Sequence, residues 1–289
     1  MAKTASRVLD RGFARTVDGL VHYRRAGPDD GPRRALVLLH AAPGSSRGLV
    51  PLISALHDVD PDLLVLAPDM PGHGDSDPLP VDAPAIADYV AALVRLLDAL
   101  GLAQVDLYGT HTGARIACEA AILEPDRVRT VIFDGIGDYD PQMRARLIDR
   151  YAPEMQPDEY GRQFVWAFNF VRDMSLHFPY FERDPTHRLM TRPVPSPAEL
   201  HDSAVEVLKG LGSYHKSYRA AFAYQTGVRI GLVRQRTVFL NAHGELPALR
   251  AATAEFASSM VDASVVLLDG LPLGKAAAIL RHIDTEKRV

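Results

Sequence analysis

The sequence predicts an α/β fold with a mostly parallel eight-stranded sheet, flanking helices and an inserted helical lid. Short, continuously apolar runs such as 35–39 and 63–67 are typical of strands buried on both faces of a parallel sheet. Helical segments separate these runs, which gives a βαβ rhythm. The rhythm stops after residue 140 and resumes near residue 231. We therefore expect a core formed by 1–140 and 231–289, interrupted by a lid over 141–230.

Each element is predicted from its hydrophobic periodicity and from the glycine and proline residues at its ends. The expected strands are 8–15, 20–25, 35–39, 63–67, 104–108, 130–133, 237–240 and 264–268. The expected core helices are 48–56, 86–100, 112–123, 248–260 and 275–282. Gly101 and Pro125 end two of them. Within the lid, which is rich in aromatic residues, 199–211 has helical spacing and the proline-rich stretch 192–197 is expected to be a loop.

Composition narrows the class of partner. The 289 residues are 47% hydrophobic and 24% charged, as in ordinary globular proteins, and the net charge of -4 argues against nucleic acid and anionic membrane surfaces. The amino-terminal six residues lack the apolar region of a signal peptide, and no apolar stretch reaches the roughly 20 residues of a membrane span. The single cysteine, Cys118, excludes a disulfide framework. We expect a cytoplasmic protein with a small-molecule substrate; its oligomeric state stays open, with a homodimer as one option.

Three motifs follow expected strands, where open α/β sheets place their ligand crevice. Segment 40–46 (His-Ala-Ala-Pro-Gly-Ser-Ser) leads into a helix, whose free amides suit an anion or a developing oxyanion. Segment 69–76 (Asp-Met-Pro-Gly-His-Gly-Asp-Ser) is a turn in which Asp69 and Asp75 can accept local backbone hydrogen bonds, a mainly structural role. In segment 109–113 (Gly-Thr-His-Thr-Gly), flanking glycines allow a tight turn that lifts His111 clear of the sheet.

The order and spacing of these motifs resemble the α/β-hydrolase superfamily over nearly the whole chain, with a lid like that of haloalkane dehalogenases and epoxide hydrolases. The resemblance implies an oxyanion hole formed by the backbone amides of Ala42 and Thr112. Residue 41 departs from the pattern, because Ala41 stands where the family has glycine. We expect no cofactor and no metal.

The third motif departs further, since family members carry Ser, Cys or Asp where this chain has His111. The resemblance therefore does not imply a serine-hydrolase mechanism for this chain. Glu245 lies near the place of the family's acid but out of the usual register, and Asp-Gly-Leu-Pro-Leu (269–273) replaces the family's histidine after the last strand. In lidded members the acid can follow the sixth strand instead, where this chain has Asp134.

We therefore expect Asp134 to orient His111 as a general base, with His243, at another strand end, as a second candidate. A carboxylate fixes the tautomer of an imidazole and raises its basicity, and such proton transfer contributes about 10² to 10⁴ in rate. The alternatives are purely structural roles, in which His111 only fills a strained turn and Asp134 only caps the turn that follows its strand. Because such a turn costs on the order of 1 to 3 kcal/mol, a use for His111 is favoured.

The remaining pocket residues are expected to be His40, Trp166 and Arg172. His40 would support its own loop as part of the pocket wall, and the other two come from the lid. A lid helix with its own small core is an equal alternative for the lid pair.

The sequence thus favours an enzyme that acts on a small carbonyl or ester-like substrate through His111 acid–base chemistry. Hydrolysis by water attack and a cofactor-free lyase or isomerase reaction are both compatible with it. A covalent acyl-imidazole route ranks last, because it needs a second base. The alternative class is a non-catalytic pseudo-enzyme or ligand sensor, since the serine of the turn and the histidine after the last strand are both missing.

Overall fold

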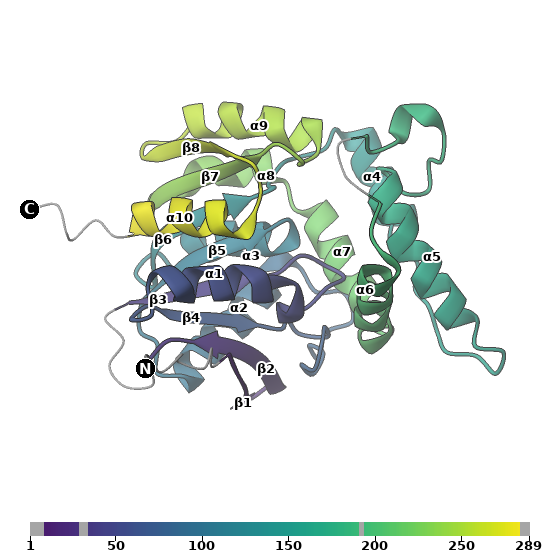
Figure 1. The fold of residues 1–289 in the computed structure, drawn as a ribbon, viewed down its shortest axis with the longest axis horizontal. Coiled ribbons are helices and arrows are strands. Elements are labelled where there is room, and N and C mark those ends of the chain that lie inside the picture. Colours follow the sequence, from purple (N-terminus) through teal and green to yellow (C-terminus); the bar gives the residue numbers. More distant parts are fainter. Residues whose placement is uncertain (1–8, 29–33, 191–193, 284–289) are drawn as a thin grey trace, which may run out of the picture.

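The computed structural model describes residues 9–28, 34–190 and 194–283. An eight-stranded sheet lies between two layers of helices, and further helices gather at one side of it (Figure 1). The strand order is β1-β2-β4-β3-β5-β6-β7-β8. Strand β2 pairs antiparallel with both β1 and β4, and the other neighbours pair in parallel. The predicted fold class is confirmed.

The elements agree closely with those expected from the sequence. The strands are β1 (Asp10–Thr16), β2 (Gly19–Ala26), β3 (Ala35–Leu39), β4 (Leu64–Pro68), β5 (Val105–Thr110), β6 (Val128–Asp134), β7 (Arg236–Ala242) and β8 (Ala263–Leu268). The core helices are α1 (Val50–Val59), α2 (Ile86–Ala99), α3 (Thr112–Leu123), α9 (Pro247–Ser258) and α10 (Pro272–Ile283). Helices α1 and α9 each place a proline in the first turn, where its missing N–H costs no hydrogen bond.

Alternation along the buried strands builds the two layers. In β3, Val37 and Leu39 face a core formed with α2, α3 and α9, whereas Leu36 and Leu38 face a second core formed with α1 and α10. All four side chains are almost completely buried. A continuous apolar run is required here because helices cover both faces of the sheet.

Between β6 and β7 the chain is mainly helical, in the region predicted to be the lid. The helices are α4 (Pro141–Arg150), α5 (Arg162–Leu176), α6 (Pro197–Lys209), α7 (Tyr214–Ala223) and α8 (Thr226–Arg229). Short 3-10 helices are η1 (Ser46–Leu49), η2 (Pro185–His187) and η3 (Ile230–Leu232). Helices α4 to α7 lie together beside the sheet in Figure 1, and they share an apolar cluster of their own that includes Leu147, Phe170, Val207 and Tyr218.

The strand order places a crevice at the carboxyl ends of β3 and β5. The chain runs from β3 to β4 on one side and then returns to β5 on the other side of β3. Connections that leave in opposite directions open a gap above the strands, where α/β proteins bind ligands. Segment 40–46 and His111 both adjoin this gap.

Some expectations lie outside the described residues: the amino-terminal segment, residue 8 of the first strand, and residues 192 and 193 of the proline-rich loop. Within the described ranges, no helix is both long and apolar enough to cross a lipid bilayer. Cys118 is buried, and burial raises the pKa of its thiol to about 12, so it packs as a neutral group.

Candidate active site

The turn between β5 and α3 carries His111 in a strained backbone conformation. Its φ of 48° and ψ of -103° make it the single non-glycine residue with positive φ in the part of the chain that the structure describes. Such a conformation costs about 1 to 3 kcal/mol. Glycine is needed on both sides, because a Cβ at Gly109 would lie 2.3 Å from the carbonyl oxygen of Gly113, and one at Gly113 would lie 2.2 Å from that of Leu39.

The imidazole of His111 is next to a carboxylate that arrives from another strand. His111 Nε2 lies 3.2 Å from Oε2 of Glu245, in the turn that follows β7. The Glu245 side chain is 9% exposed and that of His111 is 34% exposed. At this distance the carboxylate would form an ion pair with a protonated imidazole.

Gly135, directly after β6, makes room for this pair. Its φ is +79°, and a Cβ there would lie 2.6 Å from Glu245 Oε2 and 2.9 Å from His111 Cε1. Any larger residue would therefore collide with both partners.

Asp134, which the sequence suggested as the partner of His111, points its carboxylate elsewhere. It accepts hydrogen bonds from the Tyr108 hydroxyl and the Lys275 ammonium in a buried cluster. Burial, reinforced by the charge of Asp134, raises the pKa of Tyr108 well above its usual value, so the phenol remains a donor. The Asp134 backbone contacts the turn, where its carbonyl accepts the His111 N–H at 3.2 Å. The structure therefore pairs the His111 side chain with Glu245 and not with Asp134.

His111 faces a hollow of about 250 Å³ between the sheet and the helices α5 and α7, which we call the His111 hollow. Its walls are Ala41, Ala42, Pro43, His111, Thr112, Arg115, Tyr139, Tyr151, Met174, Ser175, Phe178, Leu189, Tyr218, Ala221, Phe222 and Leu246. The aromatic side chains make most of this surface apolar, which suits a small organic ligand.

Ala42 and Thr112, expected to supply oxyanion-hole amides, both line the His111 hollow beside the imidazole. Thr112 opens α3, and the first amides of a helix have no acceptor within it. The Ala42 loop is held by the Tyr218 hydroxyl, which donates to the Ala42 carbonyl at 2.9 Å. Both residues therefore lie on the wall of the hollow that His111 borders.

His40 is a structural part of the loop. Its Nδ1–H donates to the Ala41 carbonyl at 3.0 Å, and its Nε2 accepts the Met70 N–H at 2.8 Å. Burial lowers the pKa of His40, which keeps the ring neutral and Nε2 able to accept. It lines a second hollow, across the loop from the His111 hollow.

The other three expected site residues lie away from the walls of the His111 hollow. Trp166 stacks on Phe170 at 4.9 Å within the apolar cluster of α4 to α7. Arg172 is bonded to its neighbour Asp173, with a side chain 41% exposed. His243 is exposed, and its N–H donates to the Leu268 carbonyl at 3.0 Å in the turn after β7.

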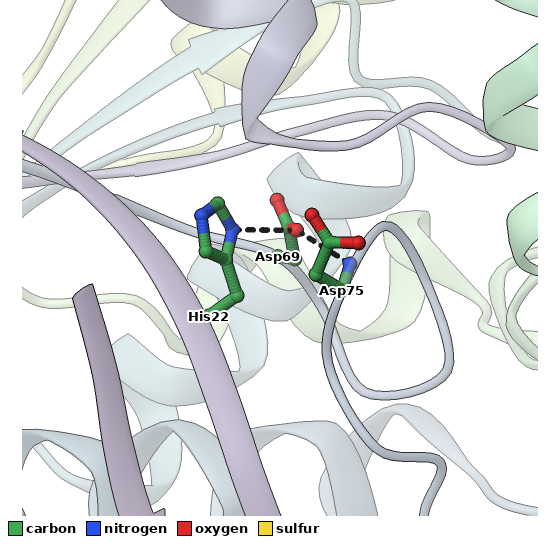
Figure 2. A group of neighbouring side chains, drawn as sticks. All are labelled: His22, Asp69 and Asp75. Carbon is green, nitrogen blue, oxygen red and sulfur yellow. Dashed lines mark hydrogen bonds and ion pairs between the residues drawn. The ribbon is translucent and has the colours of Figure 1, made fainter. Parts of the chain in front are cut away.

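Asp69 holds the turn of the second motif, as expected (Figure 2). Its Oδ1 accepts the Ser46 N–H at 2.8 Å, and its Oδ2 accepts the Asp75 N–H at 2.9 Å and contacts His22 Nδ1 at 2.8 Å. The Asp75 carboxylate is instead bonded to Lys209 at 2.8 Å. These three side chains are close enough to enclose a cation, but Asp69 is already used by hydrogen-bond donors, which favours a structural role.

Two residues beside His111, Glu245 and Arg115, are not among the site residues expected from the sequence. Glu245 lies out of the register of the family's acid. Arg115 is four residues after His111 on α3, so helical periodicity already places it on the same side. Its guanidinium donates to the carbonyls of His111 at 3.1 Å and Gly137 at 3.0 Å, which ties the turn to the segment after β6.

Comparison with protein families identifies the scaffold. A family model described as the alpha/beta hydrolase fold matches residues 34–223. The chain belongs to this family.

Curated relatives match over part of their length. The chain is 28% identical over 162 residues to "Epoxide hydrolase 2" of Siraitia grosvenorii, which covers 50% of this chain and 51% of that protein. It is 38% identical over 106 residues to "2-hydroxymuconate semialdehyde hydrolase" of Pseudomonas sp. (strain CF600), covering 30% of this chain and 37% of that protein. The chain thus spans about half or less of the length of these relatives.

Solved structures resemble the whole fold. Epoxide Hydrolase A from Mycobacterium thermoresistibile superposes with a TM-score of 0.73 at 22% identity, covering 96% of this chain and 99% of that one. The enol-lactonase from Burkholderia xenovorans LB400 gives 0.71 at 19% identity, covering 94% and 98%. At these identities the likeness concerns the fold alone.

Proposed function

We propose that this chain is an enzyme that hydrolyses a small carbonyl or ester-like substrate, with His111 as the general base. One observation carries the proposal: the His111 imidazole borders a hollow of about 250 Å³ and lies 3.2 Å from the Glu245 carboxylate. A base needs a fixed tautomer, a neighbouring charge that stabilises its protonated form, and access to the reacting atoms. The Glu245 carboxylate supports the second requirement, and the hollow beside His111 supports the third.

In the proposed reaction, Nδ1 of His111 takes a proton from water while the water oxygen attacks the carbonyl carbon. The carbonyl π electrons move to its oxygen, where the amides of Ala42 and Thr112 donate hydrogen bonds. Glu245 stabilises the imidazolium that forms. When the tetrahedral intermediate collapses, the leaving group takes the proton from the imidazolium, so one water is consumed and His111 ends neutral.

The surroundings of the pair favour this chemistry. Aromatic side chains such as Tyr139, Tyr151 and Phe178 line the hollow that the imidazole borders, which suits an organic substrate. Arg115 brings a buried positive charge to the wall of the same hollow, which favours an intermediate that carries negative charge. The names of the relatives support a hydrolase, since "Epoxide hydrolase 2" and "2-hydroxymuconate semialdehyde hydrolase" are both named as hydrolases.

Two other outcomes remain compatible with the same geometry. If the Nδ1 lone pair removes a substrate proton next to a carbonyl, the reaction is a cofactor-free lyase or isomerase step. A ligand sensor is the second candidate, favoured by the sequence 269–273, which offers no histidine after β8.

The test is a panel of p-nitrophenyl esters and small carbonyl compounds, assayed with the wild-type protein, His111→Ala and His243→Ala. We expect His111→Ala to lower kcat/KM by about 10² to 10⁴. His243→Ala is the matched control, because His243 is an exposed histidine at the same edge of the sheet, and it should stay within about twofold of wild type. Turnover that survives His111→Ala would exclude His111 as the base. Thermal stabilisation by compounds that are never turned over would support the sensor.

A further inference from the structure

A second hollow, of about 700 Å³, lies across the loop from the His111 hollow. We call it the Glu206 hollow. Its walls are the segment that follows β3 and parts of α5 and α6: residues His40, Ala41, Ala42, Pro43, Gly44, Ser45, Arg47, Gly48, Leu49, Pro51, Thr110, Val171, Met174, Ser175, Pro195, Glu199, Asp202, Ser203 and Glu206. Five residues belong to both hollows: Ala41, Ala42, Pro43, Met174 and Ser175. The two hollows are therefore neighbours that share this wall.

Three carboxylates of α6 face the Glu206 hollow, and two of them have evident structural partners. Glu199 caps its own helix, since its Oε2 accepts the Ser196 N–H at 2.7 Å. Asp202 forms an ion pair with Arg47 at 2.7 Å, where both side chains are about half exposed. Among the residues that the structure describes, Arg47 is the one lysine or arginine on the wall of this hollow, and Asp202 already pairs with it.

Glu206 differs from these two carboxylates in its burial and in its lack of a partner within the described residues. The residue is 7% exposed, and its Oε2 is buried with no hydrogen-bond partner in the part of the chain that the structure describes. Arg24, on β2, is near enough to feel the charge of Glu206, but the two form no ion pair within the described residues. A buried carboxylate without a donor is costly, so a ligand that supplies one gains the interaction that the folded chain lacks.

We infer that the Glu206 hollow binds the positively charged nitrogen of an organic amine, with Glu206 as its carboxylate partner. An ammonium group offers three donors to an acceptor that is already shielded from water, and the resulting hydrogen bonds are charge-assisted. Leu49, Val171 and Met174 give the same hollow an apolar surface for the carbon chain of the amine. The preferred substrate would then carry its reacting carbonyl at His111 and its amine at Glu206. That last step rests on the proposed function, whereas amine binding does not.

Binding can be measured without turnover by isothermal titration with three probes of one shape: 4-phenylbutylamine, the neutral 4-phenylbutan-1-ol and the anionic 4-phenylbutyrate. We expect wild-type protein to bind the amine at least tenfold more tightly than the alcohol, and the carboxylate least tightly. In Glu206→Gln, which keeps the size of the side chain, the amine and the alcohol should bind with Kd values within about threefold of each other. Asp202→Asn is the matched control, because it removes one negative charge from the same wall but leaves Glu206 in place, and it should retain the tenfold preference.

Two results would overturn the inference: equal binding of amine and alcohol by the wild-type protein, or a preference for amine that survives Glu206→Gln. The first needs no variant, so it stands even if Glu206→Gln does not fold. His111→Ala separates this inference from the proposed function, since it should keep the amine preference while hydrolysis is lost. If the wild-type protein prefers the amine but hydrolyses no substrate of the panel, the result counts against the proposed base alone. If it hydrolyses a substrate but shows no preference for the amine, the result counts against the amine site alone.

Discussion

His111 Nε2 and Glu245 Oε2 lie 3.2 Å apart, although one residue follows β5 and the other follows β7. The carboxyl ends of β5 and β7 are separated in the sheet by β6, whose chain continues as Gly135. The absence of a side chain at Gly135 lets the imidazole and the carboxylate meet over β6. The local chemistry of the site thus depends on three successive strands of the sheet.

Glu245→Gln tests the function of this contact. The amide cannot stabilise the imidazolium by charge, so we expect kcat to fall by about 10- to 100-fold while KM changes little. Initial-rate kinetics on the best substrate of the ester panel would measure both constants. Glu255→Gln, an exposed change on α9, is the control and should leave kcat unaffected. An unchanged kcat in Glu245→Gln would show that the contact has no catalytic part.

Gly135→Ala should disturb the same pair without changing either partner. The added Cβ would lie 2.6 Å from Glu245 Oε2 at a backbone φ of +79°, so both the contact and the backbone are strained. We expect a loss of about 1 to 2 kcal/mol in the free energy of unfolding and at least a tenfold loss of kcat. Gly231→Ala, where a Cβ meets nothing within 4 Å, is the control for urea unfolding and for rate. Wild-type activity in Gly135→Ala would contradict the arrangement.

Lys275→Met tests the buried cluster behind the site. The change leaves the Asp134 carboxylate, 3% exposed, with the Tyr108 hydroxyl but without its cation. Removing one partner of a buried ion pair costs about 3 kcal/mol, which urea unfolding can measure. In an Asp134→Asn background the same lysine substitution should cost much less, because no charge is left unpaired. Equal costs in both backgrounds would mean that Lys275 and Asp134 are not coupled.

His73 makes stability depend on pH. Burial lowers its pKa to about 3, and its Nε2 lies 2.8 Å from the Ser217 hydroxyl. Between an unfolded pKa of roughly 6.5 and the folded value, only the unfolded chain takes up the proton. The free energy of unfolding should therefore fall as the pH falls through this window, by up to about 1.4 kcal/mol per pH unit for this one group.

Urea unfolding at several pH values between 7 and 4 would measure that slope, with His73→Gln as the comparison. The variant should lose stability less steeply than wild type, although His40, whose pKa is also lowered by burial, will keep part of the slope. Identical slopes would assign the pH dependence to other groups.

The fold could be predicted from the sequence because its signals are local. A buried parallel strand must be apolar on both faces, as in β3, and the residues that begin and end helices lie within a few positions of the boundary. The turn at His111 was predictable for the same reason, since Gly109 and Gly113 mark the close approach of strand and helix.

The partners of His111 could not be predicted in this way. Glu245 reaches the site through the path of the turn after β7, and no local pattern specifies where that turn points. Asp134 ends its strand at the expected place, but Lys275 on α10 draws its carboxylate to another side. Whether Trp166 and Arg172 face the hollow depends on how α5 is rotated about its axis. Packing among α4 to α7 sets this rotation.

At position 111 the positive φ favours glycine for stability, whereas the proposed reaction requires histidine. Glycine adopts this conformation without a steric penalty, so relief of strain should outweigh its extra chain entropy in the unfolded state. A library randomised at position 111 and sorted only for resistance to heat should therefore enrich glycine. The same library sorted for turnover should return histidine. The difference in the free energy of unfolding between the two selected variants would measure how much histidine at this position destabilises the folded protein.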